Sequence, residues 1–188
     1  MIFNEKGLIR AMKSAYKDDG YTVAATDTGL IITAEMWGVQ LNDKAIPNTV
    51  KSLIVLHAGK IPEAGNAISV AKGETGSMFY EMAVDRMDKL NELYYAGKRA
   101  AIKPTRLTMD GYRVWQLRDN LRVHLIDPEN QQILDYSDHD AYLVGNTIFG
   151  VTVYGTVYVC REMVPPEDSA VMAHLEQMQW IPVEIADV

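Results

Sequence analysis

The stretch TRLTMDGYRVWQLRDNLRVHLIDPEN, Thr105 to Asn130, decides the fold of this chain. Polar and apolar residues alternate along it, which is the period of a β-strand with one buried face. Asp110-Gly111, Asp119-Asn120 and a third turn signal at Asp127-Pro128 divide the stretch into short runs. Short alternating runs joined by tight turns predict neighbouring antiparallel strands.

The same pattern continues towards the C-terminus. It predicts strands over residues 105–109, 112–118, 121–126, 131–136, 141–144 and 147–160. Pro165-Pro166 ends the last run, and residues 167–178 are typical of a helix. Residues 180–186 are typical of an edge strand, because Pro182 lacks the N–H that a central strand needs.

The first half reads mainly as helices. Apolar residues recur at three- and four-residue steps over residues 5–17, 47–58 and 78–96, which predicts three helices. Ser77 is the expected N-cap of the third. A hairpin over residues 21–37 and a short strand at 67–73 are expected between the helices.

Together these elements predict an α+β fold, with an antiparallel β-meander in the second half and helices packed on one face of it. We expect a single domain over residues 1–188, because one core suffices for a chain of this length. Within it, residues 1–97 are helix-rich, residues 103–160 form the sheet, and residues 166–186 supply a C-terminal helix and an edge strand. The sequence contains no internal repeat.

Composition limits the classes of function. The lone cysteine, Cys160, cannot form an internal disulfide, which favours a reducing, cytoplasmic location. No run of apolar residues is long enough for a membrane span. Residues 65–77, GNAISVAKGETGS, contain three glycines but lack both nucleotide-binding glycine motifs, so we expect no nucleotide site there and no cofactor.

One acidic segment, LDYSDHDAYL at residues 134–143, could carry chemistry. Its spacing does not match a calcium-binding EF-hand loop, so we expect no metal there and favour a turn between two strands. The enzymatic alternative is a small hydrolase or nucleotide-processing enzyme that uses Asp138, His139 and Asp140. His57 lies on the apolar face of its predicted helix, which favours a structural histidine.

Charge is divided along the chain. Residues 98–122 carry a basic block interleaved with Tyr112 and Trp115, a mixture that can bind anions or nucleic acid. The overall net charge of −7 argues against a general nucleic-acid-binding protein. The candidate anion-binding residues are Lys98, Arg99, Lys103, Arg106, Arg113, Arg118 and Arg122.

Residues 123–188 carry 11 Asp and Glu against a single Arg. Acidic side chains gathered on one face would attract a basic partner and compete with the phosphates that it normally binds. The alternative is that they only keep the protein soluble. The candidate partner-binding residues are Asp135, Asp138, Asp140, Glu162, Glu167 and Asp168.

Two segments, LIRAMKSAYKDDGYTVA at residues 8–24 and KSLIVLHAGKIPEAG at residues 51–65, resemble short accessory proteins of bacteriophages and related mobile elements. That class includes anti-CRISPR and other anti-defence inhibitors. The resemblance implies a small, acidic, non-enzymatic protein that occupies the basic nucleic-acid channel of a host effector. We therefore expect a cytoplasmic, non-catalytic module that binds a basic effector protein, with its oligomeric state left open.

Overall fold

The computed structural model describes residues 3–134, 141–153, 155–160 and 169–180. Its strands are β1 (Tyr21–Thr26), β2 (Gly29–Thr33), β3 (Trp37–Asn42), β4 (Asn66–Ala71), β5 (Glu74–Met78), β6 (Ala100–Met109), β7 (Tyr112–Leu117), β8 (Val123–Ile126), β9 (Ala141–Val144), β10 (Thr147–Thr152) and β11 (Gly155–Cys160). Its helices are α1 (Glu5–Lys17), α2 (Asn48–Ala58), α3 (Tyr80–Ala96), α4 (Pro128–Gln131) and α5 (Ser169–Leu175), with a 3₁₀ turn at Asp43–Ala45.

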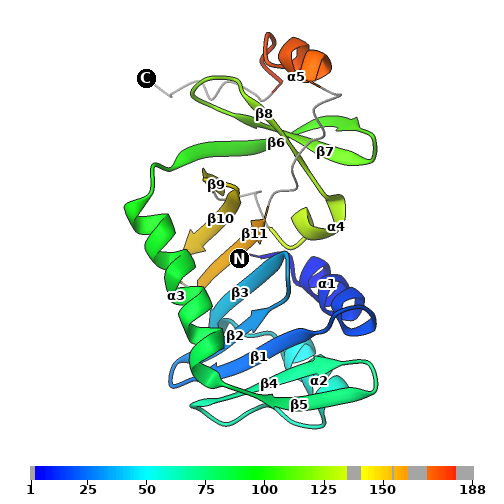
Figure 1. Ribbon diagram of the computed structural model, residues 1–188, viewed down its shortest axis with the longest axis vertical. Coiled ribbons are helices and arrows are strands. Elements are labelled where there is room, and N and C mark those ends of the chain that lie inside the picture. Colours follow the sequence, from blue (N-terminus) through cyan, green and yellow to red (C-terminus); the bar gives the residue numbers. More distant parts are fainter. Residues whose placement is uncertain (1–2, 135–140, 154, 161–168, 181–188) are drawn as a thin grey trace.

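All eleven strands belong to one antiparallel sheet with the order β5-β4-β1-β2-β3-β11-β10-β9-β6-β7-β8 (Figure 1). At one end of this order, strands β6, β7 and β8 twist away from the other strands and pack against α5 (Figure 1). Among the described helices, none is long and apolar enough to cross a membrane.

Helices pack on both faces of the sheet. Val23 and Ala25 of β1 belong to the core beneath α1 and α2, whereas Ala24 belongs to a second core beneath α3. Because successive side chains of a strand point to opposite faces, this alternation places α1 and α3 on opposite sides. The segment that follows α4 packs on the same side as α1, through Ile133 and Leu134.

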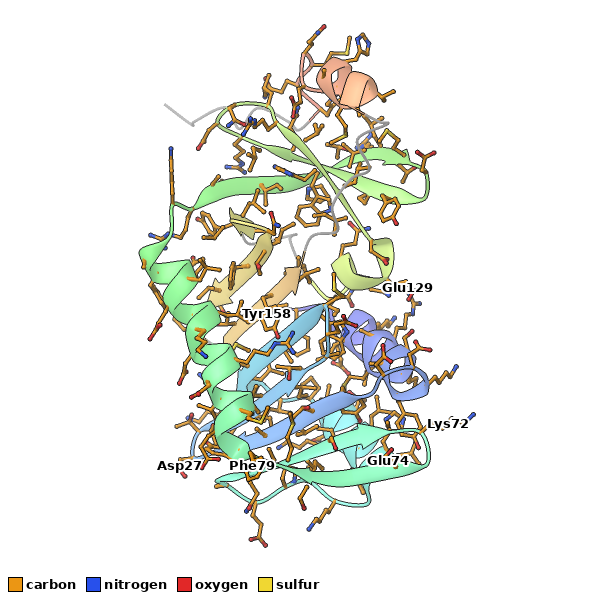
Figure 2. The ribbon with its side chains drawn as sticks, viewed as in Figure 1. Asp27, Lys72, Glu74, Phe79, Glu129 and Tyr158 are labelled. Carbon is orange, nitrogen blue, oxygen red and sulfur yellow. The ribbon has the colours of Figure 1, made fainter. Side chains whose placement is uncertain are left out.

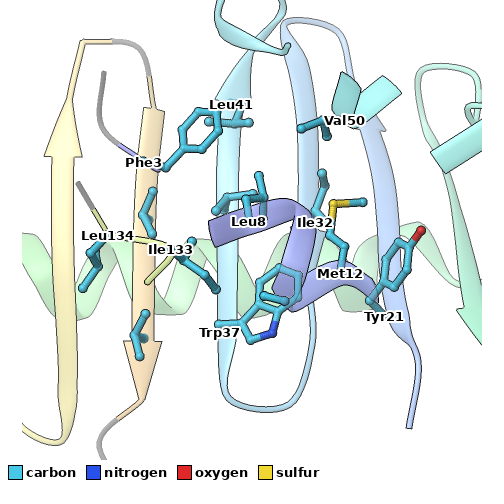
Figure 3. Close-up of a cluster of buried hydrophobic side chains, with 14 of the residues drawn as sticks. Phe3, Leu8, Met12, Tyr21, Ile32, Trp37, Leu41, Val50, Ile133 and Leu134 are labelled. Carbon is cyan, nitrogen blue, oxygen red and sulfur yellow. The ribbon is translucent and has the colours of Figure 1, made fainter. Parts of the chain in front are cut away.

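Helix α1 is fixed closely to its neighbours. The side chain of Asn4 caps it by accepting a hydrogen bond from the backbone N–H of Gly7 at 3.3 Å. Leu8 and Met12 point from α1 towards the strands and pack in the same core as Ile32 and Trp37 (Figure 3). The outer face of α1 is consequently left for solvent.

The two halves of the chain share one connectivity. In each, three strands form a meander, a helix follows, and a hairpin then pairs with the outer side of the first strand. The units are β1-β2-β3-α2-β4-β5 and β6-β7-β8-α4-β9-β10, and β11 lies between them, against β3. The repeat exists in topology although the sequence shows no repeat.

The predicted α+β class and antiparallel sheet are confirmed. Two features of the prediction differ. The sheet also takes five strands from the first half, including β3 and β5, which periodicity did not reveal. The helices cover both faces rather than one, because the strands of the first meander are buried on both sides.

Other element boundaries also differ. A strand is predicted at residues 131–136, but Gln131 is the last residue of α4. Leu134 forms only an isolated bridge with Phe3. Residues 135–136 lie outside the described part. The predicted strand at 147–160 is a hairpin of β10 and β11. Ser77 lies in β5, and Phe79 is the N-cap residue of α3. Of the expected edge strand at 180–186, residues 181–186 are outside the described ranges.

Candidate functional site

The acidic residues singled out from the sequence lie outside the described residues. This holds for the candidate catalytic cluster and for every candidate partner-binding residue of the C-terminal third. They therefore stay predictions. The residues concerned are Asp135, Asp138, His139, Asp140, Glu162, Glu167 and Asp168.

The basic block is divided between two faces of the β6-β7-β8 sheet. Lys103 lies opposite Gln116, whose side chain donates to the carbonyl oxygen of Met178 on the α5 side. Arg113 lies on the other face, which it shares with the buried Trp115. Of the remaining members, Lys98, Arg99, Arg106 and Arg122 are exposed and Arg118 is half-buried.

His57 has the partners of a structural histidine. The hydroxyl of Tyr21 lies 3.0 Å from Nδ1, and the ring of Tyr16 stacks on the imidazole with centroids 3.8 Å apart. Burial, and then Tyr16, raise the pKa of Tyr21 well above its usual range, so the phenol keeps its proton and can donate it to Nδ1. The ring thereby fixes α2 against α1 and β1.

We expect His57 to make the protein less stable in mild acid. Partial burial, and then the cationic Lys13, lower the pKa of His57 below its usual value. The unfolded chain therefore binds a proton more readily than the folded one, so stability is full above the usual histidine pKa of about 6.5 and falls as the pH drops below it. Urea unfolding between about pH 7.5 and about pH 5.5 should show this loss.

His57→Gln is the matched variant for this test. It keeps a side chain that can bond Tyr21 but removes the titrating group, so its unfolding free energy should fall less over the same pH range. The other histidines are identical in both proteins and contribute the same background. An equally steep fall in the variant would show that His57 is not responsible.

The metal-ligating side chains of the described residues are dispersed. No group of three or more His, Cys, Asp or Glu among them is placed to hold a metal ion. The sequence ETGS, at residues 74–77, lies in β5, at the edge of the sheet, and not in a phosphate-binding loop. The open hollow beside the end of α1 measures about 160 Å³ and is bordered by Asp18, Asp19 and Glu35.

Helix α3 carries a row of exposed carboxylates on its outer face. Glu81, Asp85, Asp88 and Glu92 follow one another at steps of four, three and four residues. At 3.6 residues per turn, this spacing places all four on one side of the helix, opposite the buried Met87. Within the described part of the chain, none of the four forms an ion pair. We call these four residues the acidic row.

Small residues let α3 approach the sheet. Gly38 lies against the ring of Tyr158, where an added Cβ would come within 2.4 Å of a ring carbon. Ala24 and Ala67, which are also small, belong to the same core as Ala83 of α3. The ring of Tyr158 therefore packs over Gly38, in the core beneath the helix (Figure 2).

Polar and aromatic contacts fix the rotation of α3. The side chain of Asn91 donates to the side-chain oxygen of Gln40 at 3.0 Å, and Arg86 donates to the carbonyl oxygen of Glu35 at 2.7 Å. Near the end of the helix the ring of Tyr94 packs against Phe149 with centroids 5.4 Å apart. These contacts hold the inner side of α3, so the acidic row faces solvent.

Apolar side chains lie beside the acidic row. Phe79, Met82 and Leu93 are 76%, 58% and 42% exposed, although all three are large hydrophobic residues. At 3.6 residues per turn, Met82 and Leu93 fall on one flank of the row, together with Arg86 and Lys89, while Phe79 lies at the N-cap of the helix. Exposed apolar groups next to charges are typical of surfaces that bind other proteins.

Sequence reasoning missed the acidic row, although the spacing was visible. A sum of charges over a long segment hides the row, because Arg86 and Lys89 partly cancel the acidic residues of α3. Sorting the charges by helical period separates them, because the four carboxylates share one side.

No protein-family model, curated protein or solved structure matches this chain. The arrangement of its own side chains is therefore the basis for any proposal about its function.

Proposed function

We propose that the protein is a non-catalytic protein-binding module that engages a basic partner through the outer face of α3. The acidic row is the observation that carries this proposal. Its four carboxylates span about 16 Å along the helix axis, at a rise of 1.5 Å per residue. A row of this length presents a continuous negative edge to a partner.

The composition of the surface supports a protein partner. Met82 and Leu93 offer apolar area beside the acidic row, and an interface usually combines an apolar centre with a charged rim. The charges would increase the association rate and select a basic surface, while the apolar residues would slow dissociation. A small anionic ligand would instead be repelled by the carboxylates.

We further propose that the partner is a nucleic-acid-binding effector, which the protein inhibits in the manner of anti-CRISPR proteins. A basic channel built for phosphates offers cations along a line, and a line of carboxylates is complementary to it. Inhibition would then be competitive with nucleic acid and would weaken as salt is added.

Neutralising the acidic row tests the proposal. The variant carries Glu81→Gln, Asp85→Asn, Asp88→Asn and Glu92→Gln, which remove the charges and keep the side-chain sizes. If each exposed charge contributes roughly 0.5 kcal/mol, binding should weaken by about 30-fold. The measurement is displacement of labelled DNA from each member of a panel of purified, guide-loaded RNA-guided nucleases.

A control variant removes the same number of charges elsewhere. Asp19, Asp43, Glu63 and Glu74 are exposed and none lies on α3, so their amides should leave the displacement nearly unchanged. If both variants lost the ability to displace DNA equally, the effect would result from net charge alone, and the proposal would be wrong. Failure of the unaltered protein to displace DNA from any nuclease would exclude this class of partner.

A further inference from the structure

Helix α1 carries a second charged row, opposite in sign to that of α3. Lys6, Arg10, Lys13 and Lys17 are all exposed and follow one another at steps of four, three and four residues. They lie opposite the buried Leu8, so the outermost side of α1 is entirely cationic. We call these four residues the basic row.

An apolar groove runs beside the basic row, between α1 and α2. It measures about 800 Å³ and is open to solvent. Ile9, Leu53 and Leu56 line it, and Leu56 is 77% exposed. Lys6, Arg10 and Lys13 border the same groove. An occupant would therefore bring apolar side chains together with negative charges.

The outer face of α3 has that chemistry. The acidic row repeats the spacing of the basic row with the opposite charge, so the two rows have the same length. Met82 and Leu93 lie beside the acidic row. In the same way, Ile9 and Leu56 lie beside the basic row. Both the charged and the apolar parts of the two surfaces are thus complementary.

The two rows cannot meet within one molecule. The core beneath α1 and the core beneath α3 lie on opposite faces of the sheet, which separates the helices by its full thickness. Contact between these two rows therefore requires a second molecule.

We infer that α3 of one copy docks in the α1–α2 groove of a second copy, with the acidic row against the basic row. The contact is head-to-tail, because it joins two different surfaces. An open assembly has one groove and one α3 free at its ends and grows with protein concentration, unless the rotation between copies closes a ring. Added salt weakens such assemblies, because the rows are exposed to solvent. The inference does not require the proposed function, but a basic partner on α3 would compete with it.

Charge reversal of each row tests the inference by sedimentation velocity. One variant carries Lys6→Glu, Arg10→Glu, Lys13→Glu and Lys17→Glu, and the other carries Glu81→Lys, Asp85→Lys, Asp88→Lys and Glu92→Lys. The unaltered protein should associate at low salt, and each variant alone should associate at least about tenfold more weakly. An equimolar mixture of the two variants should regain association, because each reversed row then meets a row of opposite sign.

A matched control separates the contact from net charge. Reversing Lys44, Lys60, Lys72 and Lys98 to Glu changes the net charge as much as reversing the basic row, and these residues are exposed and lie off α1. This control should associate at least as well as the mixture. Circular dichroism of each variant should give the spectrum of the unaltered protein, and a variant that fails this check is replaced by single reversals at Arg10 and Asp88.

Three results would overturn the inference: an unaltered protein that stays monomeric at the highest concentration, a basic-row variant that still associates, or a mixture that does not. These outcomes are distinct from those of the proposed function. The basic-row variant keeps the acidic row, so its binding to an effector can be measured whether or not self-association exists.

Discussion

Replacing Trp115 with alanine should lower the free energy of unfolding by about 3–5 kcal/mol, the usual cost of deleting a buried large aromatic side chain. Trp115 lies in β7 with 0% of its surface exposed, in the core beneath α1 and α4. Its indole N–H donates to the side-chain oxygen of Gln131 at 2.8 Å. The substitution therefore leaves a cavity and also removes the link between β7 and the segment of α4.

Urea unfolding of Trp115→Ala and Trp115→Phe separates these two effects. The phenylalanine variant keeps most of the ring but leaves the oxygen of Gln131 without its donor, which should cost about 1–3 kcal/mol. Leu56→Ala is the control, because Leu56 is exposed and the change should stay within roughly 0.5 kcal/mol. A loss below about 1 kcal/mol for Trp115→Ala would show that this core does not depend on the indole.

The second large effect is expected at Gly7. Alanine is better than glycine in a helix by about 1 kcal/mol, so propensity alone predicts that Gly7→Ala stabilises α1. Packing reverses the sign, because an added Cβ would lie 1.8 Å from the carbonyl oxygen of Gln132. Either α1 or the backbone near Gln132 must move, which should destabilise the protein by about 3 kcal/mol.

The neighbouring residue in α1 supplies the control for Gly7→Ala. Lys6 is adjacent in α1 but exposed, so Lys6→Ala should leave the unfolding free energy within roughly 0.5 kcal/mol of the unaltered value. Thermal unfolding followed by circular dichroism measures both variants. Stabilisation by Gly7→Ala would mean that α1 does not lie against Gln132.

The elements that sequence predicted best have strong local signals. Helix α2 begins after Pro47 and ends at Gly59, whose φ of 80° is the left-handed conformation that glycine favours. The β1–β2 hairpin has a short loop at Asp27, and α1 has an amphipathic pattern that matches its buried side. In these elements, the residues that end the helix or strand can be recognised in the adjoining sequence.

The missed elements lack such signals. β5, with the sequence ETGSM, lies at the edge of the sheet and is largely exposed, so it shows no alternation of apolar side chains. The hairpin of β10 and β11 turns without an Asn-Gly or Asp-Gly pair, and it therefore reads as one strand. At Asp127 the side chain accepts a hydrogen bond from the N–H of Glu129, which favours the short α4 over a strand.

The candidate site was only partly accessible from sequence. The sequence predicts an acidic surface that binds a basic partner, but it assigns this surface to residues 123–188 rather than to α3. The acidic and basic rows can be recognised by helical period, yet their positions on opposite faces depend on how β1 divides its side chains between two cores. That division results from long-range packing, which no local pattern encodes.

The position of β11 next to β3 affects how the chain folds during translation. β3 is synthesised more than a hundred residues before the strand that covers its outer edge, which begins at Gly155. During translation of the intervening residues, the hydrogen-bonding groups along Trp37–Asn42 have no final neighbour, and such an edge can recruit strands of other chains. The first meander must therefore remain protected from aggregation until β11 has been synthesised.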